Sequence, residues 1–169
     1  NLKLENSFRY TDSFLEYDSV SSGTADVDYT DNIEGSYTLK LIHEKEKFKN
    51  SLIYNKLHIE RYTENGSAVR SNYFGYRDAI NFVGEYNFNL DNKIVYGIDT
   101  EFDESRYPIA WTTITDLKHN ENIISQYFDY LFRPFKNLYS TIGLRNDDHS
   151  TVGSKNSGRV TLAYQLDGN

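Results

Sequence analysis

Apolar and polar residues alternate along much of this chain with a period of two. The pattern is clearest in residues 138–166, where one side of the alternation carries Leu138, Ile142, Leu144, Val160, Leu162, Tyr164 and Leu166. The other side carries mainly polar or small residues, among them Thr141, Arg145, Asp147, Ser157, Arg159 and Thr161. This alternation predicts two antiparallel strands joined by a polar loop. It fits a sheet on a soluble core, and equally a barrel wall with lipid outside and water inside.

Strand signals recur along the whole chain, and no window of a dozen residues carries an apolar stripe of helical period. The sequence therefore predicts an all-β, antiparallel, up-and-down fold of about eight strands. Short connections are expected at 44–50, 89–92 and 133–137, and longer polar ones at 18–33, 63–72 and 105–121. Because short and long connections alternate along the chain, all the long ones fall at one end of the sheet, which is the layout of outer-membrane barrels.

The charged residues favour one assignment of the two faces. In residues 93–103, Ile94, Tyr96, Ile98 and Phe102 share one side of the alternation. An Arg or Lys that faces lipid near the midplane costs about 2–4 kcal/mol. We therefore expect the opposite side to face the lumen, with Lys93, Asp99, Glu101, Arg145 and Arg159. Residues 51–61 alternate too poorly for their faces to be assigned.

Composition is compatible with this membrane interpretation. Hydrophobic residues are 38% of the 169 residues, and no apolar run approaches the length of a membrane-spanning helix. Low hydropathy does not exclude a barrel, because only every second residue of each strand meets lipid. Aromatic residues gather near the expected strand ends, as the interface girdles of such barrels require; they are Tyr73, Phe74, Tyr76, Tyr86, Phe88, Phe128, Tyr130, Phe132 and Phe135.

Charge and motifs exclude several function classes. The net charge of −7 offers no basic stripe for nucleic acid, so we expect no nucleic-acid partner. The chain has no cysteine, which excludes a disulfide scaffold and a thiolate metal site. No G-x-S-x-G, HExxH or phosphate-loop motif is present, so we do not expect an enzyme.

Three segments resemble the barrel of TonB-dependent outer-membrane receptors, particularly the cobalamin-receptor type. They are "FRYTDSFLEYDSVSSGTADVDYTDN", "YFGYRDAINFVGEYNFNLDNKIVYGIDTEFDESRY" and "GLRNDDHSTVGSKNSGRVTLAYQLDGN". The resemblance implies that residues 1–169 are an internal slice of a barrel of about 22 strands, without the plug domain, in a Gram-negative outer membrane. It further implies TonB-energised uptake of a scarce, bulky ligand such as a siderophore-bound metal or a corrinoid. The partners would be the lipid bilayer, the missing plug, the remaining strands, and TonB acting through the plug.

Two alternatives remain open. One is a complete small barrel of eight strands with a structural or adhesive role, because eight strands can close by themselves. The other is a soluble ligand-binding β-barrel, which predicts aliphatic packing inside. Pairing of the first strand with the last, and the chemistry of the inner face, distinguish these alternatives from a receptor slice.

Two candidate sites lie in the expected long connections. Asp26, Asp28 and Asp31 offer oxygen ligands that suit Ca²⁺, and a solvated acidic loop is the simpler interpretation. Tyr107 and Trp111 could offer aromatic surface to a flat ligand, or could pack the loop and lie at the headgroup boundary. The polar run from Asp147 to His149 is interpreted as a loop tip, and the four histidines lack metal-ligand spacing.

Overall fold

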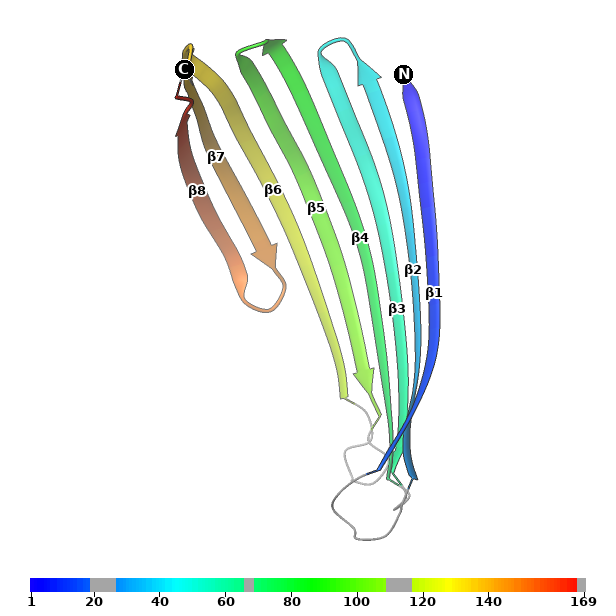
Figure 1. The fold of residues 1–169 in the computed structure, drawn as a ribbon. Coiled ribbons are helices and arrows are strands. Elements are labelled where there is room, and N and C mark those ends of the chain that lie inside the picture. Colours follow the sequence, from blue (N-terminus) through cyan, green and yellow to red (C-terminus); the bar gives the residue numbers. More distant parts are fainter. Residues whose placement is uncertain (19–26, 66–68, 109–116, 167–169) are drawn as a thin grey trace.

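The chain forms a single antiparallel β-sheet (Figure 1). The computed structural model describes residues 1–18, 27–65, 69–108 and 117–166, and within these ranges there are eight strands. The strands are β1 (Leu2–Asp18), β2 (Val27–Lys45), β3 (Phe48–Asn65), β4 (Val69–Asn89), β5 (Asn92–Tyr107), β6 (Leu117–Phe135), β7 (Leu138–His149) and β8 (Gly153–Tyr164). Each strand pairs with the next along the chain, and the predicted all-β, up-and-down antiparallel architecture is confirmed. No helix in the described ranges is long and apolar enough to cross a membrane.

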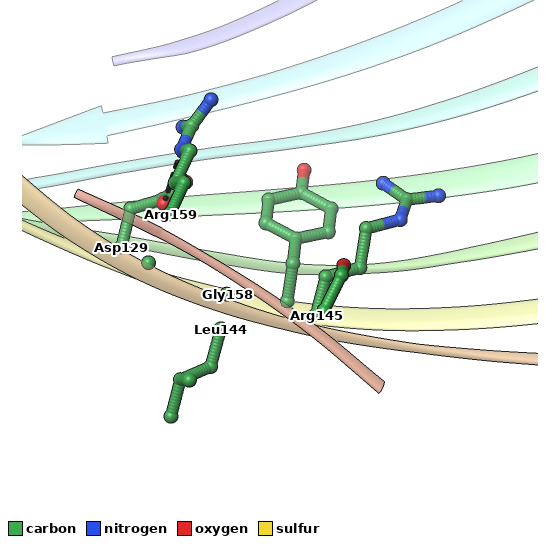
Figure 2. Close-up of a pocket in the computed structure, with 8 residues that line it drawn as sticks. Asp129, Leu144, Arg145, Gly158 and Arg159 are labelled. Carbon is green, nitrogen blue, oxygen red and sulfur yellow. Dashed lines mark hydrogen bonds and ion pairs between the residues drawn. The ribbon is translucent and has the colours of Figure 1, made fainter. Parts of the chain in front are cut away.

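The ladder registers determine which side chains share a face, because directly paired residues project to the same side of a sheet. One such row runs Ile94, Tyr130, Ile142 and Val160 across β5 to β8. Figure 2 shows Leu144 pointing away on this side, while Arg145 and Arg159 point to the other side, toward which the sheet curves. We call the side of Leu144 the convex face and the side of Arg145 the concave face.

The sheet has no hydrophobic core of its own. Ala79 is the only buried hydrophobic residue in the described part of the chain, whereas Ser125 and Asp129 are buried on the concave face. Most exposed large apolar side chains lie on the convex face, and Ile98 and Ile142 on interior strands are each 47% exposed. The convex face is therefore a broad, contiguous apolar surface of the kind that other molecules cover.

Strand β3 departs from this division of faces. Its register places Ile53, Leu57 and Ile59 on the concave side and Lys56 and His58 on the convex side. This reversal explains why the alternation of residues 51–61 gives no clear assignment. Other strands also place aliphatic side chains on the concave face, among them Val83, Val95 and Leu131, so this face is mainly but not wholly polar.

Short turns join β2 to β3, β4 to β5 and β6 to β7 at one end of the sheet (Figure 1). A carbonyl in each turn accepts a hydrogen bond from a backbone N–H beyond the hairpin: Lys47 from Asn87, Asp91 from Arg133, and Asn137 from Gln165, at 2.8–2.9 Å. These bonds tie each hairpin to the chain that follows it. At the opposite end, β7 and β8 stop well short of the other strands, because they have 12 residues each while β1 to β6 have 16–21 (Figure 1).

The long connections predicted at 18–33, 63–72 and 105–121 are wrong in their described parts. Strand β2 already begins at Val27, and β6 begins at Leu117. The strands continue because polar side chains pair across the ladder as well as apolar ones do. The hydroxyls of Thr30 and Thr63 lie 3.3 Å apart, for example, in segments whose hydropathy alone suggests a loop.

Glycine allows close packing of aromatic rings on interior strands. The ring of Tyr127 on β6 lies directly over Gly97 on β5, and a Cβ atom at Gly97 would collide with that ring and come within 2.6 Å of the Phe82 carbonyl oxygen. A Cβ atom at Gly143 would likewise collide with the Asp129 carboxylate. At Gly35 on β2, by contrast, a Cβ atom would meet nothing within 4 Å.

These contacts predict opposite outcomes for two glycine substitutions. We expect Gly97→Ala to lower the free energy of unfolding by about 1–3 kcal/mol, because the backbone oxygen cannot move aside. Gly35→Ala should change it by less than about 0.5 kcal/mol or stabilise slightly. Urea titration of the protein in detergent micelles, followed by tyrosine fluorescence, measures both variants. Equal effects would contradict the packing described for Tyr127.

Candidate functional site

The concave face carries a continuous row of polar side chains that crosses the middle of the sheet. Thr38 on β2 donates a hydrogen bond to Asn55 Oδ1 on β3 at 2.8 Å. The Asn55 amide donates to Asn81 on β4 at 3.3 Å, and Asn81 donates to Asp99 on β5 at 3.1 Å. Four neighbouring strands are thus linked by side chains as well as by their backbones.

The row continues across β5 to β7 with charged groups. The Arg145 guanidinium on β7 lies 3.8 Å from the Asp99 carboxylate, and its Nε donates to Asp147 at 2.7 Å. Ser125 on β6 donates to the same Asp147 oxygen at 2.6 Å. The guanidinium also lies over the ring of Tyr127, 5.8 Å from its centroid. Arg145 therefore connects the amide row of β3 and β4 to the acidic end of β7.

A second ion pair ties the edge strand β8 back to β6. Arg159 donates from Nε and Nη2 to the two oxygens of Asp129, at 3.1 and 2.8 Å. This paired geometry is the strong form of an Arg–carboxylate interaction. Because the pair spans β7, it needs room above that strand, and Gly143 provides it by having no side chain.

A cavity of about 260 Å³ lies between these groups and opens to the concave side (Figure 2). Its polar lining comes from Tyr127, Asp129, Arg145, Ser157 and Arg159. The two guanidiniums are balanced by the carboxylates that hold them, so the cavity does not carry a strong charge of either sign. The arrangement provides a polar, hydrogen-bonding surface.

The structure places all five residues predicted to face the lumen on the concave face. Lys93 pairs with Glu85 at 3.2 Å, and Glu101 pairs with Arg77 at 3.3 Å. Asp99, Arg145 and Arg159 make the contacts described above. These five residues do not form one cluster, because they are distributed along and across β5, β7 and β8.

The two sites predicted in long connections are only partly described. Tyr107 ends β5 and is 40% exposed, while Trp111 lies outside the described residues. Asp28 and Asp31 both belong to β2 and, being three residues apart on a strand, project to opposite faces. Asp26 lies outside the described residues, and within the described ranges no group of three or more His, Asp or Glu side chains could hold a metal ion. The calcium site and the aromatic ligand surface stay predictions.

The register also brings together three residues that sequence spacing does not connect. His119 Nε2 lies 2.6 Å from one oxygen of Glu121 on β6, and His149 Nε2 on β7 lies 3.6 Å from the other. The hydrogen bond with His119, reinforced by the charge of both histidines, lowers the pKa of Glu121 below its usual 4.5. Sequence reasoning missed this group because it depends on the strand registers, which pair Glu121 with Asp103 on β5 and place His149 opposite Ile123 on β6.

Comparison with protein-family models, with curated proteins and with solved structures finds no match to this chain. The geometry of the sheet therefore carries the functional argument. An open, all-antiparallel, up-and-down sheet is compatible with the wall of a membrane β-barrel.

The hydrogen bond between His119 and Glu121 predicts a pH dependence. His119→Ala should raise the pKa of Glu121 toward 4.5, because the carboxylate loses the partner that favours its charged form. The stabilisation that His119 provides is present above the ordinary pKa and is lost as pH falls through the lowered one. NMR titration of the Glu121 carboxyl carbon tests this. His43→Ala, on β2, is the control and should leave the titration unchanged; an unchanged titration in His119→Ala would refute the assignment.

Proposed function

We propose that this chain is part of the wall of a TonB-dependent receptor barrel in a Gram-negative outer membrane, which takes up a scarce, bulky ligand. The observation that carries the membrane part is the apolar band on the convex face. On β5 the band runs from Ile94 to Phe102, and on β6 from Ile124 to Phe132, about nine residues on each strand. A tilted transmembrane strand needs about 9–11 residues to cross the hydrocarbon core. The membrane-spanning segments of the neighbouring strands are the parts paired with this band.

Aromatic pairs border the band at the short-turn end. The rings of Phe48 and Tyr86 lie 4.7 Å apart, as do those of Tyr86 and Phe88, and the rings of Tyr130 and Phe132 are stacked at 5.1 Å. Such a girdle is expected where strands pass from hydrocarbon into the headgroup layer. It supports a membrane boundary close to the short turns.

Beyond the band at the other end, the convex face becomes charged. Lys56 lies 4.0 Å from Asp78, which pairs with Phe102 at the last position of the band, and Lys118 pairs with Glu104 beyond it at 2.9 Å. Charged pairs lie on both faces there, with Arg77 and Asp103 on the concave one, so this part of β4 to β6 suits water. In the proposed topology it extends outside the bilayer on the side opposite the short turns.

The open edges favour a slice of a larger wall over a closed barrel of eight strands. β1 pairs only with β2, and β8 pairs only with β7 in the described ranges. An unpaired strand edge in lipid leaves backbone groups without partners at a cost of several kcal/mol each. Further strands beside β1 and β8 would satisfy them. The polar concave face also disfavours a soluble barrel with an aliphatic interior.

The transport role rests on the sequence resemblance to TonB-dependent receptors. In that proposal, the concave residues line the passage or contact a plug domain, and a TonB-driven rearrangement of the plug admits the ligand. Tyr107 and Trp111 would contribute to ligand recognition at the outer end. A siderophore-bound metal or a corrinoid is the ligand class, and no covalent reaction is involved.

Thiol accessibility tests the membrane topology sharply, because the natural chain has no cysteine. Two adjacent cross-strand pairs point to opposite faces: Ile142 with Val160, and Thr141 with Thr161. With single cysteines introduced into the protein in outer membranes, a charged maleimide should label T141C and T161C and spare I142C and V160C. After detergent denaturation all four should react equally. Labelling of the convex pair in intact membranes would rule out lipid contact.

Loss of TonB tests the transport role separately. Cells that produce the full parent protein should accumulate a labelled ferric siderophore or cobalamin, and deletion of TonB should reduce that accumulation at least about tenfold, since uptake against a gradient requires energy coupling. Binding at the cell surface should persist. If uptake of every ligand in such a panel is independent of TonB while the thiol pattern holds, the barrel serves another role, such as the structural or adhesive one.

A further inference from the structure

One imidazole ring accepts two backbone hydrogen bonds in the turn that joins β7 to β8. His149 Nδ1 accepts hydrogen bonds from the backbone N–H groups of Thr151 at 3.1 Å and Val152 at 3.4 Å. A ring nitrogen that accepts cannot also carry a proton. The neutral ring in this arrangement therefore has its proton on Nε2.

The opposite edge of the same ring faces a carboxylate. His149 Nε2 lies 3.6 Å from Glu121, and the His149 side chain is only 20% exposed. An Nε2–H directed at Glu121 stabilises the tautomer that leaves Nδ1 free to accept. The ring thus connects the turn to β6, because Nδ1 accepts hydrogen bonds from the turn and Nε2 lies in ion-pair range of the Glu121 carboxylate.

The turn has few other attachments. Ser150 exchanges two hydrogen bonds with the backbone of Asn122 on β6, from its N–H and to its Oγ, both at 2.9 Å. Val152 is 81% exposed and contributes no apolar packing. The conformation of residues 151–152 therefore depends chiefly on His149.

Charged and titratable groups on three neighbouring strands surround the ring. Strand β6 contributes Glu121 and the titratable His119, and β5 contributes Asp103 opposite Glu121. On the same face, Asp147 of β7 pairs with Lys155 of β8. The charged and titratable groups near His149 are thus Asp103, His119, Glu121, Asp147 and Lys155. A positive charge on the ring requires a proton on Nδ1, the atom that faces two N–H donors.

We propose that the β7–β8 turn is a proton-sensitive switch, closed by neutral His149 and released when the ring is protonated. The imidazolium then has donors at both nitrogens and keeps its contact with Glu121, while the N–H groups of Thr151 and Val152 lose their acceptor. Backbone pairing of β7 with β8 does not involve Nδ1 and persists. The opening is confined to the tip of the hairpin.

Hydrogen exchange of the protein in a lipid bilayer or detergent micelle tests the switch. Protection factors of the Thr151 and Val152 amides, each taken relative to an unstructured peptide at the same pH, should fall about tenfold between pH 8 and pH 5. Protection of the Ile142 amide, in the middle of β7, should not change. The nitrogen shifts of His149 should report the Nε2–H tautomer at pH 8.

Two variants separate the switch from general acid loosening. In His149→Asn, the side-chain oxygen can still accept from the turn but cannot titrate, so protection should be independent of pH. His119→Gln removes the other imidazole and should retain the pH dependence of the natural protein. Three results would overturn the proposal. The protection of the Thr151 and Val152 amides in the natural protein could be independent of pH, or it could fall as much in His149→Asn as in the natural protein. The third is an Nδ1–H tautomer of His149 at pH 8.

Discussion

The backbone hydrogen bonds that pair each strand with the next are the constraint on which this structure depends. Because side chains alternate between faces, a slip of one residue in any ladder would move apolar groups to the polar side and charges to the apolar side. Seven ladders connect the eight strands, and the irregularities in register lie near two short turns, between Asn87 and Asn89 and between Phe132 and Phe135. The body of the sheet therefore keeps one assignment of faces from β1 to β8.

A single-layer sheet cannot remove its apolar residues from water by itself. Most folds bury such a face against a second layer, yet here the large apolar side chains of the convex face stay exposed and the buried groups are mainly polar. The polar row from Thr38 to Asp147 further shows that the concave side is suited to contact with water or with a polar partner. Lipid on one side and a hydrated interior on the other satisfy both requirements at once, which is why the membrane proposal fits better than a soluble barrel.

Where one face of a strand is apolar, the sequence alone predicts which residues share a face. Residues 93–103 and 138–166 alternate cleanly, and this alternation alone groups Lys93, Asp99 and Arg145 on one face, as the registers also do. It predicts strand extent poorly where both faces are polar, as at the start of β2 and β6, because no hydropathy contrast remains. The Glu121 cluster was equally inaccessible, since His119 and His149 become neighbours only through the register between β6 and β7.

Different interactions therefore stabilise the two ends of the sheet. Within the apolar band, the proposed contact with lipid would favour this assignment of faces, and the side-chain pairs of the concave face add to it. Beyond the band, strands such as β2 and β3 are held by cross-strand groups: Tyr29 donates to Glu64 at 2.7 Å, and Thr30 lies beside Thr63. That hydrogen bond raises the pKa of Tyr29, which keeps the phenol a donor at any physiological pH. Interactions of this kind respond to protons and salt far more than apolar burial does. Sensitivity to protons and salt should therefore concentrate at the end opposite the short turns, where in the proposed function a receptor would meet its ligand.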